Sequence, residues 1–467
     1  MKYAKLLVIG LILLAICGYY HRIPTDDDAW FAEESYFLLH EGQIRSEFFR
    51  GLLGWESYYF LSHKLFIALG AALQYLFPLS PYTSKLSGLI FFIALIFLFK
   101  YYLKNQSKIF FLLLLILIFS NTLLIKMSFE NRPELMLTTL GFASFILIYN
   151  NNSLLKSGLS GILAGLAVLS HLNGLIYVSA GFVMLLCAKR YLDSCIFIIT
   201  AILTSSLYFG DILYFNGFQT WWFQFRNDPA TQNSFGFIEK IKVIITYPKL
   251  FFESPEQAVL TLLLIVLGWH CRKVLRQINT NLVVYALALF CSFWLLTKRA
   301  SGIYQILFIP TIFAIILDLY SNSPRKSFGK AVYIMVFLYL CVGIIGNSQI
   351  IYKNAVSHDL PQQYADLSKK ITEKKVGIVP ITFFFNEYPK YQRLLCQTNF
   401  ELQSIKEKNL TISQFVKWAN QNNASFIILD YKNGYSNYYP VKGAVKIGDY
   451  KIIYSDNQFV VYVYRPI

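Results

Sequence analysis

The chain has 467 residues, of which 56% are hydrophobic and 17% aromatic, and its formal net charge is +16. Apolar runs of about 18 residues or more recur along its first three quarters, and each can cross a bilayer as a helix, which excludes an ordinary soluble protein. The lysines and arginines stand in short segments at the ends of these runs, as in cytoplasmic loops, so we interpret the charge as membrane topology and expect no nucleic-acid binding.

The first span is predicted within residues 1–20, and two lysines near its start place the N-terminus in the cytoplasm. We interpret this span as uncleaved. An external loop follows at 22–81. It contains an apolar helix at 55–77 that is interrupted by polar residues, so we expect it to lie along the membrane surface. If it crossed the membrane instead, the basic clusters further along the chain would all fall outside.

Ten further spans are predicted, which makes about eleven in all. The second to seventh lie at about 82–102, 108–125, 134–149, 157–169, 174–189 and 194–215, the eighth to tenth end near 272, 298 and 325, and the eleventh covers about 331–349. A second external loop, rich in aromatic residues, occupies 216–256. No internal repeat is visible, which disfavours a transporter built from inverted halves.

From about residue 352 the composition becomes that of a soluble protein. Strands are predicted at 375–380 and 425–430, an amphipathic helix at 411–421, and a terminal hairpin of 445–455 and 458–465 that turns at Asp456-Asn457. We therefore predict a polytopic α-helical transmembrane domain over residues 1–351 and a small extracytoplasmic α/β domain over 352–467.

Two acidic motifs lie in segments that this topology places outside. T-D-D-D-A-W-F-A-E-E-S-Y begins at Thr25, and N-R-P-E covers Asn131–Glu134. Each motif alone could be a helix cap or an interfacial anchor. Their placement on the same face of the membrane indicates a common site.

The first motif resembles a known family pattern. D-D-A-W-F-A, followed by Gly42, is similar to the D-E-A-x-Y-A…G first-loop motif of GT-C superfamily glycosyltransferases, and most of all to the branch of protein O-mannosyltransferases and lipid A aminoarabinose transferases. Asp27 falls on the leading Asp of that motif and Asp28 on its Glu. The proline pair that the family often has before the interfacial helix is absent, and Trp55-Glu56 stands nearby instead.

Two further segments carry the resemblance. R-P-E, Arg132–Glu134, is similar to the second-loop acidic motif, and G-L-A-V-L-S-H-L-N-G, from Gly165, resembles the junction of the fifth and sixth spans in bacterial members. The resemblance implies a glycosyltransferase of the cell (inner) membrane that moves a hexosyl or pentosyl unit from a polyprenyl-phosphate donor. The acceptor would be a lipid, glycan or protein, as in the synthesis of cell-envelope glycans.

The chemistry of such a reaction selects candidate residues. An acceptor hydroxyl must lose its proton as it attacks the anomeric carbon, which needs a carboxylate base, and cations must stabilise the leaving phosphate. The candidate catalytic residues are Asp27, which we assign as the base, Asp28 and Glu134. The candidate substrate-binding residues are Arg132, His171, Asn173, Lys298, Arg299 and Tyr304. Oxygen ligands of this kind suit a divalent cation, but the spacing demands no metal.

Other interpretations stay open at this point. Lys298 and Arg299 could snorkel to the interface instead of binding phosphate, and His171 could be a structural hydrogen-bonding residue. Asp211, inside the seventh span, must face the protein interior and could be structural. The whole chain could also be a transporter or flippase of a lipid-linked substrate, or a non-catalytic membrane scaffold.

Overall fold

The computed structural model describes residues 2–19, 22–149, 151–229, 231–232, 236–273, 277–297, 301–322, 329–357, 360–386, 388–404, 409–434 and 436–465. The chain divides into two compact units. The helical unit consists of Met1–Arg22, His63–Phe66 and Lys85–Val356, and the mixed unit consists of Ile23–Ser62, Ile67–Ser84 and Ser357–Ile467. Each unit is described by itself.

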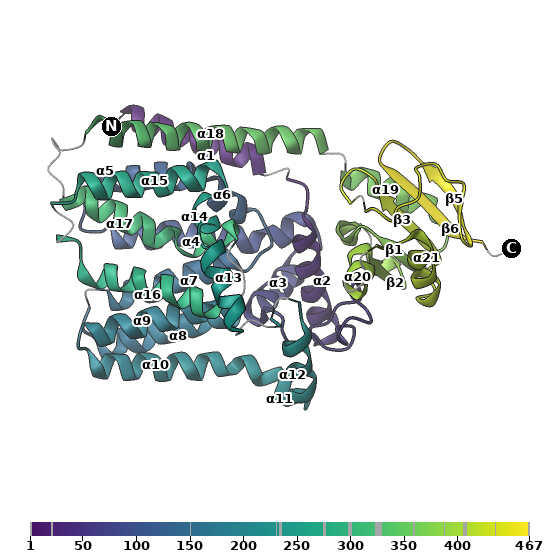
Figure 1. Cartoon of the computed structure of the whole chain (residues 1–467), viewed down its shortest axis with the longest axis horizontal. Coiled ribbons are helices and arrows are strands. Elements are labelled where there is room, and N and C mark those ends of the chain that lie inside the picture. The colour runs from purple at the N-terminus through teal and green to yellow at the C-terminus, as the bar shows by residue number, and fades with distance from the viewer. Residues whose placement is uncertain are drawn as a thin grey trace. The chain divides into compact units, whose positions relative to one another are not determined.

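The helical unit is a set of apolar helices joined by short turns (Figure 1). Its elements are α1 (Lys2–Tyr19), most of α4 (Pro81–Tyr102), α5 (Lys108–Phe119), α6 (Thr122–Ser128), α7 (Glu134–Ile148), α8 (Leu154–Ser170), η1 (Leu172–Gly174), α9 (Leu175–Cys187), α10 (Tyr191–Ser206), η2 (Leu207–Phe209), α11 (Gly210–Tyr214), α12 (Phe218–Asn227), α13 (Phe237–Thr246), α14 (Lys249–Phe252), α15 (Pro255–His270), α16 (Thr280–Leu296), η4 (Gly302–Leu307), α17 (Ile309–Asn322) and nearly all of α18 (Lys330–Ser357).

Three helices within the described residues are long and apolar enough to cross a membrane: α4, the run Tyr191–Tyr214 and the helix that begins at Lys330. Two bent pairs, α5 with α6 and Phe237–Phe252 with α15, bring the number to five if each pair is one span. Six shorter apolar helices have 10–17 residues. A helix stands at each predicted span position, and the chain is a multi-pass membrane protein.

The predicted third span is not one straight helix. The chain bends by 77° between α5 and α6. The reason is Asn121, which lies between the two helices and accepts a hydrogen bond from the Leu124 N–H at 2.8 Å through its side chain. This side chain replaces the backbone carbonyl that a continuous helix would supply, so it begins a new helix in a new direction.

The helix predicted over 55–77 is also shorter in the structure, where α3 covers only Lys64–Leu76. Gly51, Leu53 and Gly54 have positive φ angles of 82°, 54° and 75°, so the chain enters this region through tight turns. Backbone groups of the following residues then bond to the 44–46 segment instead of forming a helix, with Ser46 N–H donating to the Trp55 carbonyl and Tyr59 N–H to the Ile44 carbonyl.

Small residues bring α8 close to α10, which runs beside it in Figure 1. A Cβ atom on Gly161 would lie 2.3 Å from the Phe197 carbonyl oxygen, and one on Gly165 would lie 2.8 Å from the Ala201 carbonyl oxygen. The two glycines are four residues apart, the spacing that lets membrane helices touch through their backbones. This contact fixes the position of α8, whose C-terminal end carries His171.

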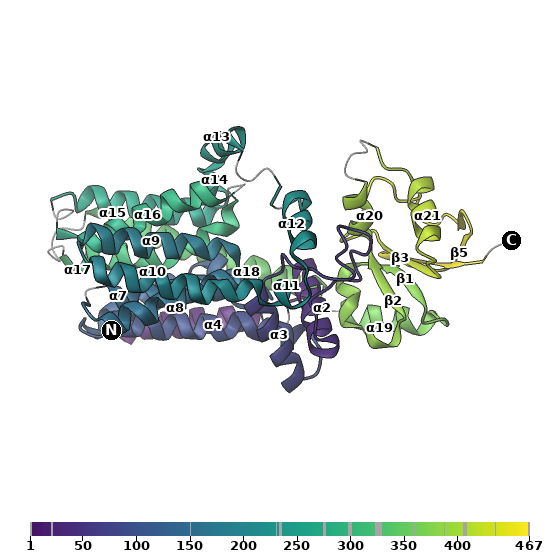
Figure 2. The ribbon, with the colours of Figure 1, turned by 90° about the horizontal axis from the view of Figure 1, so that it is seen from below.

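The mixed unit is built around a six-stranded sheet of order β2-β1-β3-β6-β5-β4 (Figure 2). Strands β2, β1 and β3 are parallel, and β3, β6, β5 and β4 are antiparallel. Its elements are α2 (Asp26–Glu41), most of α3, α19 (Leu360–Lys370), β1 (Val376–Val379), η5 (Ile381–Phe385), η6 (Tyr388–Lys390), β2 (Arg393–Cys396), α20 (Gln397–Gln403), α21 (Ile412–Gln421), β3 (Phe426–Asp430), β4 (Lys446–Ile447), β5 (Tyr450–Ser455) and β6 (Phe459–Tyr464).

The strands β1, β3, β5 and β6 and the helix α21 stand where the sequence predicts them. Asp456 turns the terminal hairpin, as predicted, because its carboxylate accepts the N–H groups of Gln458 and Phe459, both at 2.7 Å. Strand β2 and the helices α19 and α20 were not predicted. The sequence assigned residues 22–81 to an external loop of the transmembrane domain, and in the structure most of these residues group with the sheet in the mixed unit.

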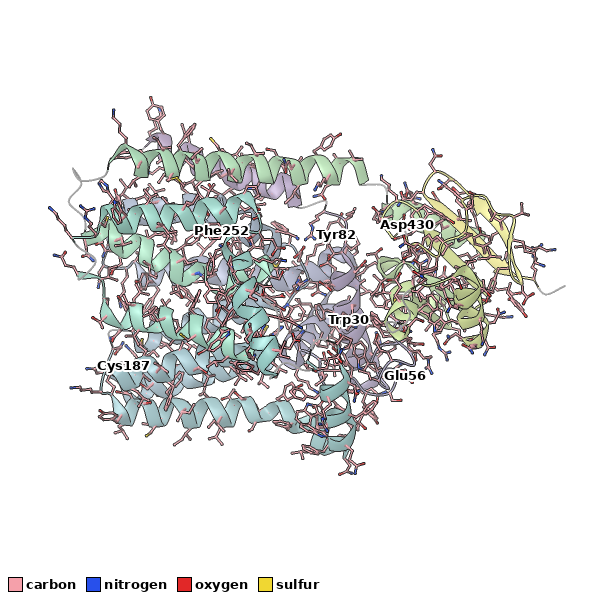
Figure 3. The ribbon with its side chains drawn as sticks, in the orientation of Figure 1. Trp30, Glu56, Tyr82, Cys187, Phe252 and Asp430 are labelled. Carbon is pink, nitrogen blue, oxygen red and sulfur yellow. The ribbon has the colours of Figure 1, made fainter. Side chains whose placement is uncertain are left out.

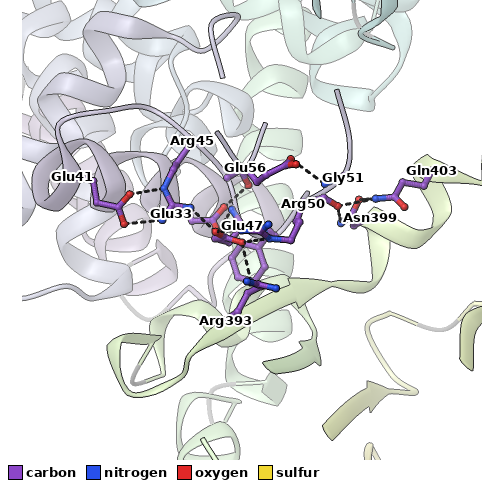
Figure 4. Close-up of polar contacts among 12 residues, drawn as sticks. Glu33, Glu41, Arg45, Glu47, Arg50, Gly51, Glu56, Arg393, Asn399 and Gln403 are labelled. Carbon is purple, nitrogen blue, oxygen red and sulfur yellow. Dashed lines mark hydrogen bonds and ion pairs between the residues drawn. The ribbon is translucent and has the colours of Figure 1, made fainter. Parts of the chain in front are cut away.

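Aromatic and ionic contacts join the 23–62 segment to the sheet within this unit. Tyr36 of α2 meets the rings of Phe384 and Tyr388 edge-on, with centroids 6.2 and 5.3 Å apart. The Glu47 carboxylate binds Arg45 and Arg50, each at 2.7 Å, and Arg393 of β2 at 3.3 Å (Figure 4). These contacts attach α2 and the segment after it to β2 and to the residues that follow β1.

Candidate active site

The second acidic motif begins α7 in the helical unit. Pro133 caps the helix and Glu134 is its first residue, almost fully buried at 2% exposure. The Arg132 guanidinium makes two hydrogen bonds to the Glu134 carboxylate, of 2.6 and 3.1 Å. This is the two-point geometry in which Arg binds carboxylates most strongly. Glu134 therefore holds Arg132 in place, which reduces its own capacity to accept a proton from a substrate.

His171 lies beside this ion pair, in the extended turn between α8 and η1. Its Nδ1 accepts the Asn173 N–H at 2.9 Å, so in the neutral ring the proton is on Nε2. Burial lowers the pKa of His171 to about 4, the positive charge of Arg132 lowers it too, and Glu134 opposes the change. His171 is therefore neutral near pH 7 and can donate a hydrogen bond from Nε2.

His63 completes this group, and the sequence did not single it out as a site residue. Its ring stacks on the His171 ring, with centroids 4.4 Å apart and planes inclined by 16°. Burial first, and then His171 and Arg132, lower the pKa of His63 well below its ordinary value. The structure thus brings the candidates Arg132 and Glu134, at the start of α7, together with the candidate His171, which follows α8. Asn173 joins through its backbone N–H.

Lys64, the next residue, forms an ion pair with Asp211 of α11. This partner explains how a carboxylate is accommodated in the seventh predicted span, because a buried charge needs an opposite charge nearby. Lys64 also lies 5.3 Å from the centre of the Tyr208 ring. A lysine and a histidine that interrupt an apolar run were visible in the sequence, but the partner 147 residues away was not.

The remaining substrate-binding candidates are less clearly placed. Lys298 and Arg299 lie outside the described residues. Tyr304 is in η4, half-buried, and its ring lies 5.7 Å from that of Phe293. The turn that carries it is anchored by Gln257, whose side-chain amide donates to the Gly302 carbonyl at 2.6 Å.

The first acidic motif opens α2 in the mixed unit, and its three aspartates differ in burial. Asp26 is exposed, Asp27 is half-buried and Asp28 is fully buried. The Asp28 carboxylate accepts the Thr25 N–H at 2.7 Å, so it caps the helix. Asp27 and Asp28 lie in the first turn, where the helix dipole favours ionised carboxylates. Gly42 ends the helix in the left-handed conformation, with φ 73°.

Aromatic packing fixes the direction of α2. The Trp30 ring stacks against Trp55 and Tyr59, with centroids 5.8 and 6.0 Å away (Figure 3 labels Trp30). Since Trp30 is three residues after Asp27, the candidate base, this contact holds the turn that carries it. Trp30, which falls on the variable position of the motif, therefore has a structural role.

Two buried glutamates follow on the same helix. Glu33 accepts the Ser46 hydroxyl at 2.5 Å and the N–H groups of Glu47 and Phe48, both at 3.0 Å. Burial raises the pKa of Glu33 to about 8, although the hydrogen bonds of Ser46 and the Phe48 N–H act in the opposite direction. The Glu34 carboxylate accepts a hydrogen bond from the Ser62 hydroxyl. The sequence motif contained both residues, but nothing in it distinguished them from solvated acids.

The described residues contain no group of three or more His, Cys, Asp or Glu side chains that could hold a metal ion.

A scan against models of known protein families finds no match, and a search of curated proteins finds none either. Solved structures do match the chain, and they show that its fold is GT-C-like, as the sequence motifs suggested. One of them is ArnT from Cupriavidus metallidurans bound to undecaprenyl phosphate, with a TM-score of 0.62 and 12% identity over 99% of this chain and 98% of that one.

The same protein in the apo state gives a TM-score of 0.61 and 13% identity, over 99% of this chain and 97% of that one. The mycobacterial arabinofuranosyltransferase AftD gives a TM-score of 0.51 and 10% identity, covering 100% of this chain but only 40% of its own. At these identities the similarity concerns the fold.

Proposed function

We propose that the chain is a membrane glycosyltransferase that moves a sugar from a polyprenyl-phosphate donor to an acceptor hydroxyl at the external face of the cell (inner) membrane. The observation that carries this proposal is the agreement of fold with ArnT along nearly the whole of both chains. That protein was solved with undecaprenyl phosphate, which is the leaving group such a reaction would release. The two acidic motifs and the Arg132 group supply residue types that the reaction needs.

Asp27 is the base in this proposal. Its carboxylate takes the proton of the acceptor hydroxyl as the oxygen bonds to the anomeric carbon, and the bond from that carbon to the phosphate oxygen breaks. The polyprenyl phosphate leaves with the electron pair, and the proton stays on Asp27. Asp28 is bound to the helix terminus by the Thr25 N–H, so it supports the first turn of α2.

Arg132 is the cation assigned to the departing phosphate, because guanidinium groups bind phosphate oxygens at two points. Glu134 orients it through the two hydrogen bonds described above. Neutral His171 adds a donor from Nε2 for a phosphate or sugar oxygen. Lys298, Arg299 and Tyr304 remain proposed contacts to the donor, on the strength of their place in the sequence.

The test is turnover by the purified chain in lipid nanodiscs, with a panel of radiolabelled polyprenyl-phosphate sugars and detection of released polyprenyl phosphate. Asp27→Asn should lower kcat by about 10²–10⁴-fold, the usual contribution of a general base. Donor binding should be nearly unchanged, since the phosphate is held by other residues.

Asp26→Asn is the matched control, because Asp26 is adjacent and exposed, and it should have little effect. A folded Asp27→Asn protein that turns over at the wild-type rate would show that another residue is the base. If the wild type binds donors but transfers none of the sugars, the result would favour the interpretation of the chain as a transporter.

A further inference from the structure

Helix α13 of the helical unit has three faces with different surroundings. The face that packs into the core of the unit consists of Val243, Tyr247 and, in α14, Leu250. The polar face carries Glu239 and Lys242. The third face is an apolar stripe of side chains that are each between 42% and 80% exposed: Phe237, Ile238, Ile241, Ile244 and Ile245. Steps of one, three and four residues gather these side chains on one side of a helix.

The axis of α13 runs across the direction of the neighbouring spans. The run Phe237–Phe252, which comprises α13 and α14, meets α15 at an angle of 91°. In Figure 1, α13 also passes across the end of α16, with which it is in contact. Since α15 and α16 occupy the predicted eighth and ninth spans, a helix in this direction lies parallel to the membrane surface. An apolar stripe beside a polar face is typical of helices that lie in the interface of a bilayer.

The contacts of α13 with α16 place it at the depth of that interface. Lys240 donates from Nζ to the Thr297 carbonyl at 2.8 Å, just after α16, and the Trp294 indole N–H donates to the Lys240 carbonyl at 3.1 Å. The Tyr247 hydroxyl donates to the Phe290 carbonyl at 2.5 Å. Phe290 lies six residues before the last residue of α16, which is about 9 Å along the helix. Interfacial helices bury their apolar face about 5–10 Å into the boundary between headgroups and acyl chains.

This depth identifies what covers the stripe. The Phe290 ring packs on the Tyr247 ring, with centroids 4.4 Å apart, and is nevertheless exposed. Leu287 and Leu295 of α16 are exposed as well, so α13 lies beside a surface that lipid contacts. The stripe contains no charged residue, and five large apolar side chains together are unfavourable in water. Lipid acyl chains next to the headgroups are the environment that suits it.

The same two helices hold the segment 298–301, to which two proposed donor contacts belong. Lys240 of α13 binds the carbonyl of Thr297 before the segment. The Glu253 carboxylate, at the end of α14, accepts the N–H of Gly302 after it. Both flanks of the segment are therefore bonded to the run that carries the apolar stripe.

We propose that the apolar stripe of α13 is seated among lipid acyl chains at the external membrane surface, and that this contact sets the depth of the segment 298–301. A polyprenyl phosphate in the bilayer has its phosphate at the level of the headgroups, so a segment held there can meet it. The role of the segment in donor binding rests on the proposed function, whereas the lipid contact does not.

Fluorescence quenching tests the lipid contact. In a cysteine-free full chain in nanodiscs, Ile241→Cys of the stripe and its exposed neighbour Lys242→Cys each carry an NBD fluorophore. The label at 241 should be quenched by phospholipids with a nitroxide near the carboxyl end of the acyl chain and shielded from aqueous iodide, and the label at 242 should show the reverse. Equal iodide quenching at both positions would overturn the proposal. So would a label at 241 that is shielded from both quenchers, because a second copy of the chain or another of its segments would then cover the stripe.

Binding of undecaprenyl phosphate to the same nanodiscs tests the effect on the segment. Ile241→Gln should weaken it by roughly 3- to 10-fold, the factor that corresponds to half-burial of one isoleucine side chain. Lys242→Gln introduces the same side chain one residue further and leaves the stripe intact, so it should bind as the wild type does. A monodisperse Ile241→Gln protein with wild-type affinity would refute the effect on the segment. If the wild type binds no polyprenyl phosphate, the proposed function fails together with the role of the segment, and quenching alone decides the lipid contact.

Discussion

The buried carboxyl of Glu33 should make the mixed unit less stable as pH rises. Its pKa is raised from an ordinary 4.5 to about 8, so the folded chain binds this proton more tightly than the unfolded chain does. Between these two values the native state carries more protons, and the free energy of unfolding falls with increasing pH. Integrated from pH 5 to pH 8, the loss is roughly 3–4 kcal/mol at about 1.4 kcal/mol per pKa unit.

Glu33→Gln isolates this contribution. Glutamine has the same shape, its oxygen can still accept the N–H groups of Glu47 and Phe48, and the Ser46 hydroxyl can reverse to accept from the new amide. The variant has no proton to lose, so its stability relative to wild type should rise steadily from pH 5 to pH 8. Other titrating groups are common to both proteins and cancel in the difference.

The assay is unfolding of the full chain in nanodiscs, followed by tryptophan fluorescence at several pH values. Trp30 and Trp55 lie in the same unit as Glu33 and report on it. Glu373→Gln removes a carboxylate from the surface of this unit and should show no such trend. If the difference between wild type and Glu33→Gln is the same at pH 5 and pH 8, Glu33 does not titrate in this window and the argument from burial is wrong.

Two further predictions concern packing and topology. Gly161→Ala should destabilise the helical unit by about 1–3 kcal/mol, as overpacking does, because its Cβ would meet the Phe197 carbonyl oxygen at 2.3 Å. The control Gly158→Ala, whose Cβ would lie 3.5 Å from Ile196, should be neutral or slightly stabilising. Equal thermal midpoints for the two variants would contradict the close contact of α8 and α10. In a cysteine-free background, a cysteine at Asp26 should react with an impermeant label from outside and one at Lys189 only from inside; external labelling at 189 would overturn the predicted orientation.

Much of the local structure could be predicted because local chemistry determines it. Apolar runs predicted the helices, and period-two patterns with the Asp456-Asn457 turn predicted the terminal hairpin. Strand β2 was missed because R-L-L-C is only four residues long and lies next to a helix. The bend at Asn121 was missed because one polar residue inside an apolar run does not show whether its side chain bonds to the backbone.

The candidate site could be predicted only in part, since the sequence does not report contacts between distant segments. The motifs indicated Arg132, Glu134 and His171, which lie together in the helical unit. His63 stacks on a residue 108 positions away by sequence number, and no local pattern predicts such a contact. Glu33 looked like any other helix acid, because its raised pKa comes from the chain that folds over it.

The shared packing of α2 with the C-terminal sheet has a consequence for building hybrid proteins. A chimera that exchanges only the tail after α18 would separate Glu47 from Arg393 and leave the face of Tyr36 against foreign side chains. The exchangeable block is discontinuous in sequence: it comprises residues 23–62 and 67–84 together with the tail. A substitution in the tail that disturbs this packing would therefore also disturb α2, the helix that carries Asp27.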